Sequence, residues 1–341
     1  MIYILLVLRS KVYVTRRICE PALLMLEKKC DVSMHNKLRA PTRKEILNGV
    51  HNKDGILCML SDKIDANVME AAGPRLKVIS SLSTGVDHID LNEATKRGIY
   101  VTFTSEILTE ATADLTFALI LVLARKIIEG NELVKQRKWK VGWMPKLLLG
   151  TDLNGMILGI LGLGRIGLAV ARRAKGFNME IIYHNRKTRN YQAETELNAK
   201  SVDLNTLLKQ SDFLSIHASL NSSSFHLLDN SRLSIMKNTA YIINTSRGQV
   251  INETDLVKAL KKKIIAGAAL DVFEKEPLSR YNSLLRMKNV VTLPHIGSAT
   301  FQTRLKMSQV AVQNLLNIFN AKPPLFLAND EINKPNTHAR S

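Results

Sequence analysis

Cysteine and aromatic residues are scarce in this sequence, and their scarcity argues against two classes of protein. Cys19, Cys30 and Cys58 form no recognisable pairing or metal-binding motif. This pattern argues against a disulfide-stapled scaffold and is typical of a reducing compartment. Aromatics make up only 5% of the chain, and the lysines and arginines are scattered along it. Since no base-stacking platform is evident, we expect no nucleic-acid partner.

Hydrophobic runs long enough to cross a membrane are also missing. The apolar stretch 115–124 is flanked by Asp114 and Arg125. Apolar residues 1–8 are too short to span a bilayer and lack the basic region and cleavage site of a signal peptide. The last three residues, 339–341, are not the peroxisomal S-K-L address. We therefore expect a cytoplasmic protein without a membrane partner, and leave the mitochondrion and the peroxisome open.

Acidic residues are few relative to basic ones, 30 against 48, and the formal net charge is +18. Such a field favours anionic substrates and cofactors. Neutral drift of the surface composition explains the same charge, so both interpretations stay open. Histidines offer no metal-ligand spacing, so we expect no metal site. The histidines concerned are His35, His51, His88, His184, His226 and His338.

A glycine-rich loop supplies the first functional motif. The apolar run 156–161 predicts a buried parallel strand, and 168–174 predicts a helix. Between them lies G-x-G-x-x-G, in which Gly162, Gly164 and Gly167 permit a tight turn and close approach of a pyrophosphate to a helix N-terminus. This context predicts a dinucleotide-binding domain.

The next predicted strand, 180–184, lacks the acidic residue that usually follows it in NAD-binding proteins. The chain continues with Asn185, Arg186 and Lys187, and the first acid is Glu194. Cations attract a ribose 2′-phosphate, which a carboxylate would repel. An ordinary solvated basic loop is the alternative, but the pattern favours NADP(H), with Arg186 and Lys187 as its ligands.

Arg247, Glu276 and His295 are the candidate catalytic residues. Each is predicted to end its own strand-like segment downstream of the glycine loop. An arginine fork can hold a substrate carboxylate, and an imidazole can protonate a carbonyl oxygen as hydride reaches carbon. A nearby carboxylate favours the protonated imidazole. The three residue types together indicate hydride transfer to a 2-keto acid.

Further strand-like segments supply the rest of the predicted site. Ligands of open α/β sheets bind at the carboxyl ends of the strands, where Ser219, Thr245 and Asp271 fall. The strands concerned are predicted within 211–219, 241–245 and 264–271. His217 lies in the first of them, but no acid partner is near it in the sequence, so we interpret it as structural.

The sequence resembles the D-isomer-specific 2-hydroxyacid dehydrogenase family from about Lys11 to about Ala321, and within it the glyoxylate reductase/hydroxypyruvate reductase branch. The blocks that carry the resemblance are GLGRIG, NTSRGQVIN, GAALDVFEKEP and LPHIGSAT, joined by DGILCMLSDKID and LKVISSLSTGVDHID. Asn185 departs from the branch, which usually has Gly there.

The resemblance implies that Arg247 binds substrate, that His295 donates the proton and that Glu276 is its partner. It also implies that backbone N–H groups of Thr84 and Gly85 bind the substrate carboxylate. The cofactor contacts that it implies are Thr112, Gly164, Arg165, Ile166, Arg186, Ser219, Thr245, Asp271 and Gly297.

The resemblance implies NADPH-dependent reduction of glyoxylate or hydroxypyruvate to glycolate or D-glycerate. Two alternatives stay open: another family member, such as a phosphoglycerate dehydrogenase, and a non-enzymatic corepressor of the same fold. Both usually carry the acidic ribose-binding residue that is absent at Asn185 and Arg186.

The predicted fold class is α/β, with two doubly wound parallel-sheet domains, Rossmann-like and flavodoxin-like, and an active-site cleft between them. Residues 1–105 and 298–325 are expected to form the substrate-binding, flavodoxin-like domain. Residues 106–297 are expected to form the NADP-binding Rossmann domain, and 326–341 an irregular tail. Helices are predicted at 109–127 and 299–319.

A homodimer is also expected, joined mainly through the cofactor domain and residues 136–150. That segment contains Trp139, Trp143 and a leucine run, 147–149, which would form a costly exposed patch on a monomer. The resemblance implies that Trp143 reaches the neighbouring subunit's active site and shapes acid selectivity. The alternative is that both tryptophans pack on their own chain.

Overall fold

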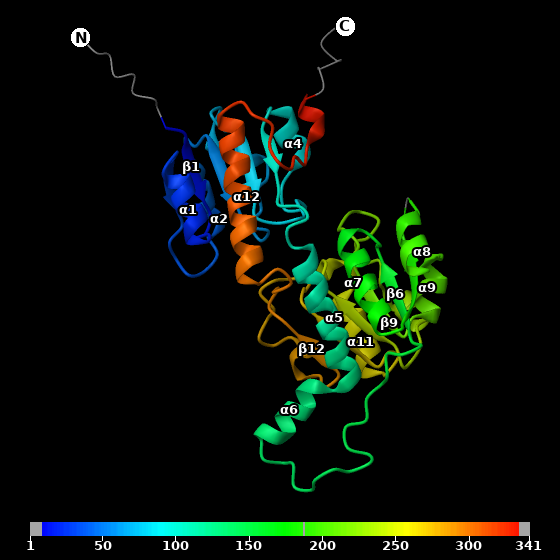
Figure 1. Cartoon of the computed structure of the whole chain (residues 1–341). Coiled ribbons are helices and arrows are strands. Elements are labelled where there is room, and N and C mark those ends of the chain that lie inside the picture. Colours follow the sequence, from blue (N-terminus) through cyan, green and yellow to red (C-terminus); the bar gives the residue numbers. More distant parts are fainter. Residues whose placement is uncertain (1–8, 187, 334–341) are drawn as a thin grey trace, which may run out of the picture. The chain divides into compact units, whose positions relative to one another are not determined.

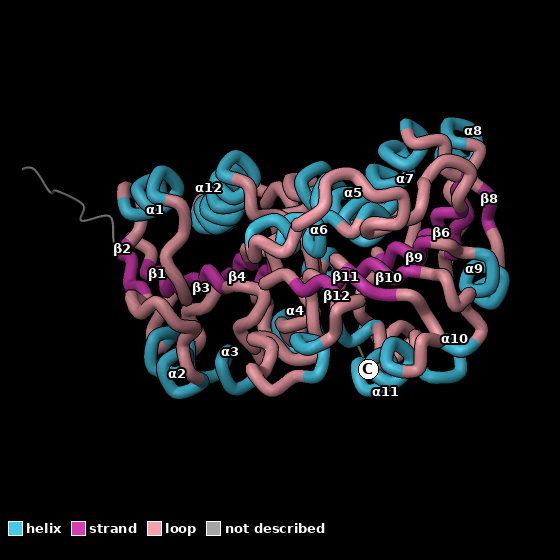
Figure 2. The backbone as a smooth tube through the Cα atoms, turned by 90° about the horizontal axis from the view of Figure 1, so that it is seen from below, coloured by secondary structure: helices cyan, strands magenta, loops and turns pink. Residues whose placement is uncertain are grey.

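The computed structural model describes residues 9–186 and 188–333 of the chain. The chain divides into two compact units, which we call the first unit (Met1–Leu108 with Ala299–Ser341) and the second unit (Thr109–Ser298). Each unit is built on one parallel sheet with helices on both faces (Figures 1 and 2). The predicted α/β class with two parallel-sheet domains is confirmed.

The first unit contains a five-stranded sheet of order β2-β1-β3-β4-β5, in which every pair of neighbouring strands is parallel. This is the strand order of flavodoxin-like folds. Its strands are β1 (Lys11–Val14), β2 (Asp31–Met34), β3 (Gly55–Cys58), β4 (Val78–Ser81) and β5 (Tyr100–Thr102). Its helices are α1 (Glu20–Glu27), α2 (Arg43–Val50), α3 (Ala66–Ala72), α4 (Leu91–Lys96), α12 (Phe301–Phe319) and the 3₁₀-helix η3 (Asp330–Asn333).

Side chains of β1 alternate between two cores, as the period of a strand requires. Val12 and Val14 are buried on the face covered by α1 and α12, whereas Tyr13 is buried on the face covered by α2 and α3 (Figure 2). Strands buried on both faces read as continuous apolar runs, which is why the sequence indicates β3 so clearly.

The C-terminal part of the described chain completes the first unit. α12 packs on α1 and β4, and Ser80 Oγ donates a hydrogen bond to the Ala311 carbonyl at 2.9 Å. Beyond α12, Leu327 forms an antiparallel bridge with Thr102, and the Asn329 side chain accepts a hydrogen bond from the Val101 backbone N–H at 2.9 Å. Residues 327–329 therefore pair with the exposed edge of β5.

The second unit contains a seven-stranded parallel sheet of order β12-β11-β10-β9-β6-β7-β8. Apart from β12 at one edge, its six strands from β8 to β11 follow the order of dinucleotide-binding sheets. The strands are β6 (Ile157–Leu161), β7 (Glu180–His184), β8 (Lys200–Ser201), β9 (Phe213–Ile216), β10 (Tyr241–Asn244), β11 (Gly267–Leu270) and β12 (Val290–Thr292). The helices are α5 (Thr109–Arg125), α6 (Ile127–Lys135), α7 (Arg165–Gly176), α8 (Tyr191–Leu197), α9 (Leu204–Gln210), α10 (Asn230–Ser234) and α11 (Glu253–Lys261). Two 3₁₀-helices, η1 (Gly248–Val250) and η2 (Ser283–Arg286), complete it.

Helices α5, α7 and α8 cover one face of this sheet, and α9, α10 and α11 cover the other (Figure 2). β6 serves both cores, because Leu158 and Ile160 are buried toward the first set and Leu161 toward the second. The predicted helix 109–127 ends earlier than expected, at Arg125. Lys126 takes a left-handed conformation (φ 49°) that separates α5 from α6.

Candidate active site

The glycine-rich loop joins β6 to α7 in the second unit. Gly162 has φ 96°, and a Cβ there would lie 2.9 Å from the backbone of His217 and Ala218. A Cβ at Gly167 would lie 2.6 Å from the Gly162 carbonyl oxygen. Only glycine fits both positions, so the strand, the turn and the helix can pack this closely.

Gly164 is different, because a Cβ there would meet no atom within 4 Å. It is the N-cap of α7, and no side chain caps the helix at this end. Arg165 and Ile166 open the helix, so the backbone N–H groups of its first turn face the open side of the loop. Backbone N–H groups at a helix N-terminus can bind a pyrophosphate, so this end of α7 fits a dinucleotide cofactor.

The loop after β7 carries the predicted 2′-phosphate ligands. Arg186 donates from Nη1 to Asn221 Oδ1 at 3.1 Å and to the Ser223 hydroxyl. Arg189 is instead held by Glu194, with Nη2 and Oε2 2.9 Å apart. Lys187 lies outside the described residues. Arg186 thus faces the segment after β9, next to two neutral polar side chains.

Arg247 follows β10 at the start of η1, in a tight turn that Asn244 organises. The fully buried Asn244 side chain donates from Nδ2 to the Arg247 carbonyl at 3.0 Å and accepts from the Ser246 N–H at 3.0 Å. Arg247 itself donates from Nη1 to the Ser246 carbonyl at 2.9 Å. The sequence analysis missed Asn244, although an asparagine at a strand end often marks such a turn.

Glu276 and His295 form the predicted pair, with Glu276 Oε2 and His295 Nδ1 2.8 Å apart. Their side chains are 30% and 26% exposed, so the pair is partly open to a ligand. Burial raises the pKa of Glu276, but the hydrogen bond and charge of His295, the Phe273 N–H and the Arg247 guanidinium together hold it below its ordinary value. Glu276 is therefore a carboxylate at neutral pH, and Arg247 is close enough to stabilise it.

One expectation about these residues needs correction. None of them lies in a strand: β10 ends at Asn244, β11 at Leu270 and β12 at Thr292. Arg247, Glu276 and His295 lie in the loops that follow. The difference is largest for Glu276, whose Oε1 accepts from the Phe273 N–H at 3.0 Å within a turn of its own.

Asp271 holds the loop that carries His295. Its carboxylate accepts the backbone N–H of Ile296 at 2.7 Å and of Gly297 at 2.8 Å, and its side chain is almost fully buried. His295 adopts φ 54°, a left-handed conformation unusual for a residue other than glycine. Two anchored N–H groups directly after it keep the backbone in that conformation. Burial raises the pKa of Asp271, although these N–H groups and His295 act against the rise.

Thr112 and Thr245 lie close together beside this site, joined through Thr116. The Thr116 hydroxyl lies 2.8 Å from that of Thr245 and 2.7 Å from the Thr112 carbonyl, and all three residues are buried. A Cβ at Gly297 would lie 3.3 Å from both Thr112 and Asp271. The structure thus brings four of the predicted cofactor residues together, and adds Thr116. Ser219 lies in the loop after β9, where it is exposed and its carbonyl accepts from Ser224 Oγ at 2.7 Å.

His217 lies near the glycine-rich loop, and its contacts indicate a structural role. Its Nε2 lies 2.7 Å from Ser215 Oγ, and its backbone N–H donates to the Leu161 carbonyl at 2.8 Å. Burial lowers the pKa of His217 to about 3. The ring is therefore neutral at physiological pH and contacts β9, whereas the link to Leu161 of β6 comes from the His217 backbone.

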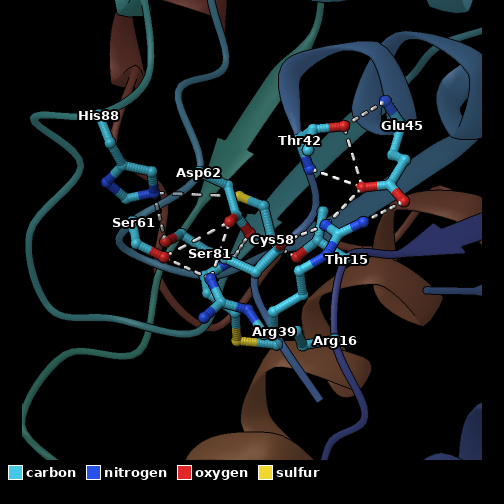
Figure 3. A network of polar contacts seen from close by, with 12 residues as sticks. Thr15, Arg16, Arg39, Thr42, Glu45, Cys58, Ser61, Asp62, Ser81 and His88 are labelled. Atoms are coloured by element: carbon cyan, nitrogen blue, oxygen red, sulfur yellow. Dashed lines mark hydrogen bonds and ion pairs between the residues drawn. The ribbon is translucent and has the colours of Figure 1, made fainter. Parts of the chain in front are cut away.

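Thr84 and Gly85 belong to the first unit, in the loop after β4. Ser83 Oγ donates to the Gly85 carbonyl at 2.5 Å, and Thr84 Oγ1 donates to the Thr104 carbonyl at 3.3 Å. A chain of polar contacts lies beneath this loop, because Ser81 Oγ lies 2.7 Å from Ser83 Oγ. Ser81 Oγ also lies 3.0 Å from His88 Nε2 (Figure 3). The loop is therefore anchored by buried side chains.

Asp62 ties together the loops after β1 and β3 in the same unit (Figure 3). It is 2% exposed and accepts from Thr15 Oγ1 at 2.5 Å, from Arg16 Nη2 at 2.8 Å and from the Met59 N–H at 2.8 Å. The chain leaves β1 and β3 toward opposite sides of the sheet, and ligands of open sheets bind at such a switch point. Asp62 therefore links the two loops at the carboxyl ends of β1 and β3.

Trp143 lies in the segment after α6, which projects from the sheet of the second unit (Figure 1). Its side chain is 87% exposed, and Trp139 and Leu149 are also exposed. Trp139 Nε1 donates to the Gly142 carbonyl at 3.3 Å. Neither tryptophan is buried by its own chain.

Over 9–186 and 188–333, no group of three or more His, Cys, Asp or Glu side chains could hold a metal ion. No helix in this part of the chain is long and apolar enough to cross a membrane.

Comparison with known proteins defines the class. Residues 117–297 match the family model "D-isomer specific 2-hydroxyacid dehydrogenase, NAD binding domain". The chain is 48% identical over 328 residues to a glyoxylate reductase from Thermofilum pendens, covering 96% of each chain. It is 46% identical over 329 residues to one from Thermococcus litoralis, covering 95% of this chain and 98% of the relative.

Solved structures agree. The NADPH-dependent glyoxylate/hydroxypyruvate reductase from Sinorhizobium meliloti, in complex with NADP and malonate, superimposes with a TM-score of 0.82 at 31% identity, over 94% of this chain and 97% of that chain. A protein from Thermus thermophilus superimposes with a TM-score of 0.87 at 43% identity, over 93% and 99%. The fold and the site thus define a nicotinamide-dinucleotide oxidoreductase. The chain belongs to the D-isomer-specific 2-hydroxyacid dehydrogenase family.

Proposed function

We propose that this protein reduces glyoxylate and hydroxypyruvate to glycolate and D-glycerate with NADPH. The observation that carries the proposal is the Glu276–His295 pair, 2.8 Å apart, beside Arg247 on adjacent loops. A carboxylate-held imidazole next to a guanidinium suits proton donation to a 2-keto acid. The names of the Thermofilum and Sinorhizobium relatives support the choice of acids.

Each residue has a defined task in this mechanism. Arg247 holds the substrate carboxylate through its planar fork, and the backbone N–H groups of Thr84 and Gly85 bind the same group. When bound, NADPH would supply a hydride to the keto carbon. As the carbonyl oxygen gains negative charge, His295 donates its Nε2 proton to it, giving the hydroxyl group. Glu276 stabilises the protonated ring from Nδ1 and fixes its orientation.

The two units divide this work. We assign substrate binding to residues 1–105 and 298–325 and cofactor binding to 106–297. The cofactor residues are Thr112, Gly162, Gly164, Arg165, Ile166, Gly167, Arg186, Lys187, Ser219, Thr245, Asp271 and Gly297.

NADPH is the proposed hydride donor because of the loop after β7. The described residues between His184 and Glu194 include no carboxylate, and Glu194 is engaged by Arg189 and by the Tyr183 hydroxyl at 2.6 Å. Arg186 donates hydrogen bonds to Asn221 and Ser223, which are both neutral. A 2′-phosphate would replace weak neutral acceptors with a charged one, which strengthens the interaction. Ser223, whose hydroxyl can also donate, joins Arg186 in this proposed site.

A homodimer joined through the cofactor domain and residues 136–150 is part of the proposal. Trp139, Trp143 and Leu149 expose large apolar surfaces that a soluble monomer rarely carries together. We further assign Trp143 to the partner's active site, where it shapes acid selectivity. The cytoplasm is the proposed compartment, in keeping with the free thiols of Cys19, Cys30 and Cys58.

The test is a spectrophotometric assay of NADPH oxidation with glyoxylate, hydroxypyruvate, pyruvate and 3-phosphohydroxypyruvate as substrates. We expect turnover with the first two acids and less with pyruvate. Turnover with 3-phosphohydroxypyruvate alone would instead indicate a phosphoglycerate dehydrogenase. Tight NADPH binding without turnover of any acid would indicate a dinucleotide-sensing protein.

A further inference from the structure

Two loops of the second unit lie in direct backbone contact next to the candidate active site. One carries Arg247 and continues through η1, and the other runs from Asp271 to Glu276. A Cβ at Gly248 would lie 1.9 Å from the Phe273 carbonyl carbon and 2.4 Å from the Glu274 nitrogen. The two loops therefore touch at Gly248, one residue beyond Arg247.

Glu274 joins these loops with its side chain and its backbone. Its Oε1 accepts from the Glu253 N–H at 2.9 Å, and its carbonyl accepts from Gln249 Nε2 at 2.8 Å. Its own N–H donates to Glu253 Oε2 at 3.3 Å. Glu274 thus contacts both ends of the segment 249–253, which follows Arg247 directly.

His226 supplies a third attachment from outside the two loops. Its Nε2 lies 2.7 Å from Glu274 Oε1, with each side chain 32% exposed. Its backbone N–H donates to the Gln249 carbonyl at 2.8 Å, so it too contacts both loops. Phe225 stacks on the His226 ring, with the two ring centroids 4.0 Å apart. The backbone of His226 is left-handed (φ 48°). The ring is therefore held in one orientation by packing.

None of these contacts involves a group assigned to the reaction. The side chain of Glu274 faces His226 and Glu253, whereas Glu276, two residues later, faces His295. Phe273, the residue before Glu274, donates its N–H to Glu276 Oε1 at 3.0 Å. A shift of the backbone at Glu274 would therefore move the N–H that orients Glu276.

We infer that Glu274, clamped by His226 and by the Glu253 N–H, is a positioning residue that sets the spacing between Arg247 and the Glu276–His295 pair. The inference rests on the proposed function, because the spacing matters only if these three groups act on one substrate. Arg247 must hold the acid while His295 meets its carbonyl oxygen. A displacement of about 1 Å between such groups can cost about a hundredfold in rate.

The test compares Glu274→Ala and Glu274→Gln in the full-length protein. Alanine removes both side-chain contacts, whereas glutamine keeps an oxygen that accepts the Glu253 N–H. We expect Glu274→Ala to lower kcat/KM for glyoxylate by about ten- to a hundredfold. The KM for NADPH should stay near the wild-type value. Glu274→Gln should recover most of the loss.

A pH profile separates positioning from mere stabilisation. If the loop loosens, Glu276 leaves His295, and the fall of kcat/KM at high pH should move to lower pH in Glu274→Ala. A general loss of folded protein lowers activity at every pH, but it does not move this alkaline limb, the pH range in which kcat/KM falls. His226→Asn provides a second variant, because asparagine tolerates the left-handed backbone but its shorter side chain loses the contact with Glu274. It should shift the limb in the same direction.

A matched control is Glu196→Ala, which removes another partly exposed carboxylate, paired with Arg172 at 2.6 Å on α7 and α8. It should leave all kinetic constants unchanged. Wild-type kcat/KM and an unmoved pH limb in Glu274→Ala and His226→Asn would overturn the inference, whatever the melting temperature does. If Glu274→Ala does not fold, His226→Asn alone decides. His295→Ala distinguishes the two failures, since full activity in that variant would overturn the proposed function itself.

Discussion

The side chain of Asn185 accepts a hydrogen bond from the backbone N–H of Leu163, with Oδ1 and N 2.6 Å apart. This contact links the loop after β7 to the glycine-rich loop. Asn190 adds a second link, from its Nδ2 to the Leu163 carbonyl at 3.1 Å. Asn185 is the one position in this loop that departs from the resemblance. The departure fixes the base of the loop while Arg186 points toward Asn221.

Replacement of Arg186 by alanine should erase much of a preference for NADPH over NADH. A charge-assisted contact to phosphate contributes about 1.5–3 kcal/mol, or roughly ten- to a hundredfold in affinity. Arg189→Ala is the matched control, because Glu194 already holds that guanidinium. The measurement is kcat/KM for both cofactors in the wild type and both variants. Equal values for NADH and NADPH in the wild type would refute the assignment.

Asn185→Asp extends the same prediction. An aspartate can keep the bond to the Leu163 N–H, but its charge would repel a 2′-phosphate. NADPH use should fall while NADH use is spared or improved. A variant that loses both cofactors equally would show that only the fold of the loop has changed.

Loss of the imidazole at His295 should abolish most of the catalysis without preventing NADPH binding. General acid catalysis contributes roughly two to four orders of magnitude. Glu276→Gln should instead move the alkaline fall of activity to lower pH, because the amide no longer favours the protonated ring. Fluorescence titration with NADPH and pH–rate profiles test both. An unchanged profile in Glu276→Gln would remove Glu276 from this role.

Substitutions of Arg247 should affect the substrate more than the cofactor. Arg247→Ala removes the fork that holds the acid, so kcat/KM for glyoxylate should fall by more than about a hundredfold. Arg247→Lys keeps the charge but loses the bidentate geometry, and should recover only part of it. The KM for NADPH is the internal control. Near-wild-type kcat/KM in Arg247→Ala would contradict the assignment.

His217 predicts a pH dependence of stability. Its folded-state pKa, about 3, lies below its ordinary value, about 6.5. Between these values the unfolded chain binds the proton more readily, so stability falls as pH decreases through this window. The slope from this one group is at most about 1.4 kcal/mol per pH unit. His217→Gln should show a flatter decline in denaturant unfolding between about pH 6.5 and about pH 4. Parallel declines would show that burial does not perturb His217.

The assembly prediction concerns Trp143. Light scattering at micromolar concentration should give the mass of a dimer, and a clean monomer mass would rule the dimer out. Trp143→Ala should change the ratio of hydroxypyruvate to pyruvate activity if this side chain reaches the partner's site. If the ratio is unchanged while the dimer persists, only the assignment to the partner's site is wrong.

The sequence predicts the elements well wherever the pattern is local. It predicts β7 to the residue, because two flanking turns bound a short apolar run, and it places the glycine loop correctly because the strand and helix periods change there. It cannot predict how side chains far apart in the chain meet. The Asn185–Leu163 bond, the Thr112–Thr116–Thr245 cluster and the His226–Glu274 pair arise from folding, and no spacing in the sequence indicates them.

The loop positions of the candidate catalytic residues show the same limit. Runs such as INTSRGQVI and ALDVFEKEP contain a strand and a turn without an obvious break in polarity. Only the hydrogen bonds of Asn244 and Glu276 define where the strand stops, and these depend on tertiary contacts.

The first unit is made from two distant parts of the chain, and this has a consequence for its biosynthesis. Residues 11–102 provide all five strands of its sheet, yet α12 and residues 327–329 cover one face and pair with the edge at β5. During translation the strands of this unit leave the ribosome first, while the whole second unit is still to be made. Until α12 and residues 327–329 are made, part of one apolar face of the nascent sheet and its edge at β5 remain uncovered. Synthesis therefore begins with the first unit, but the second unit can complete its fold before the first unit does.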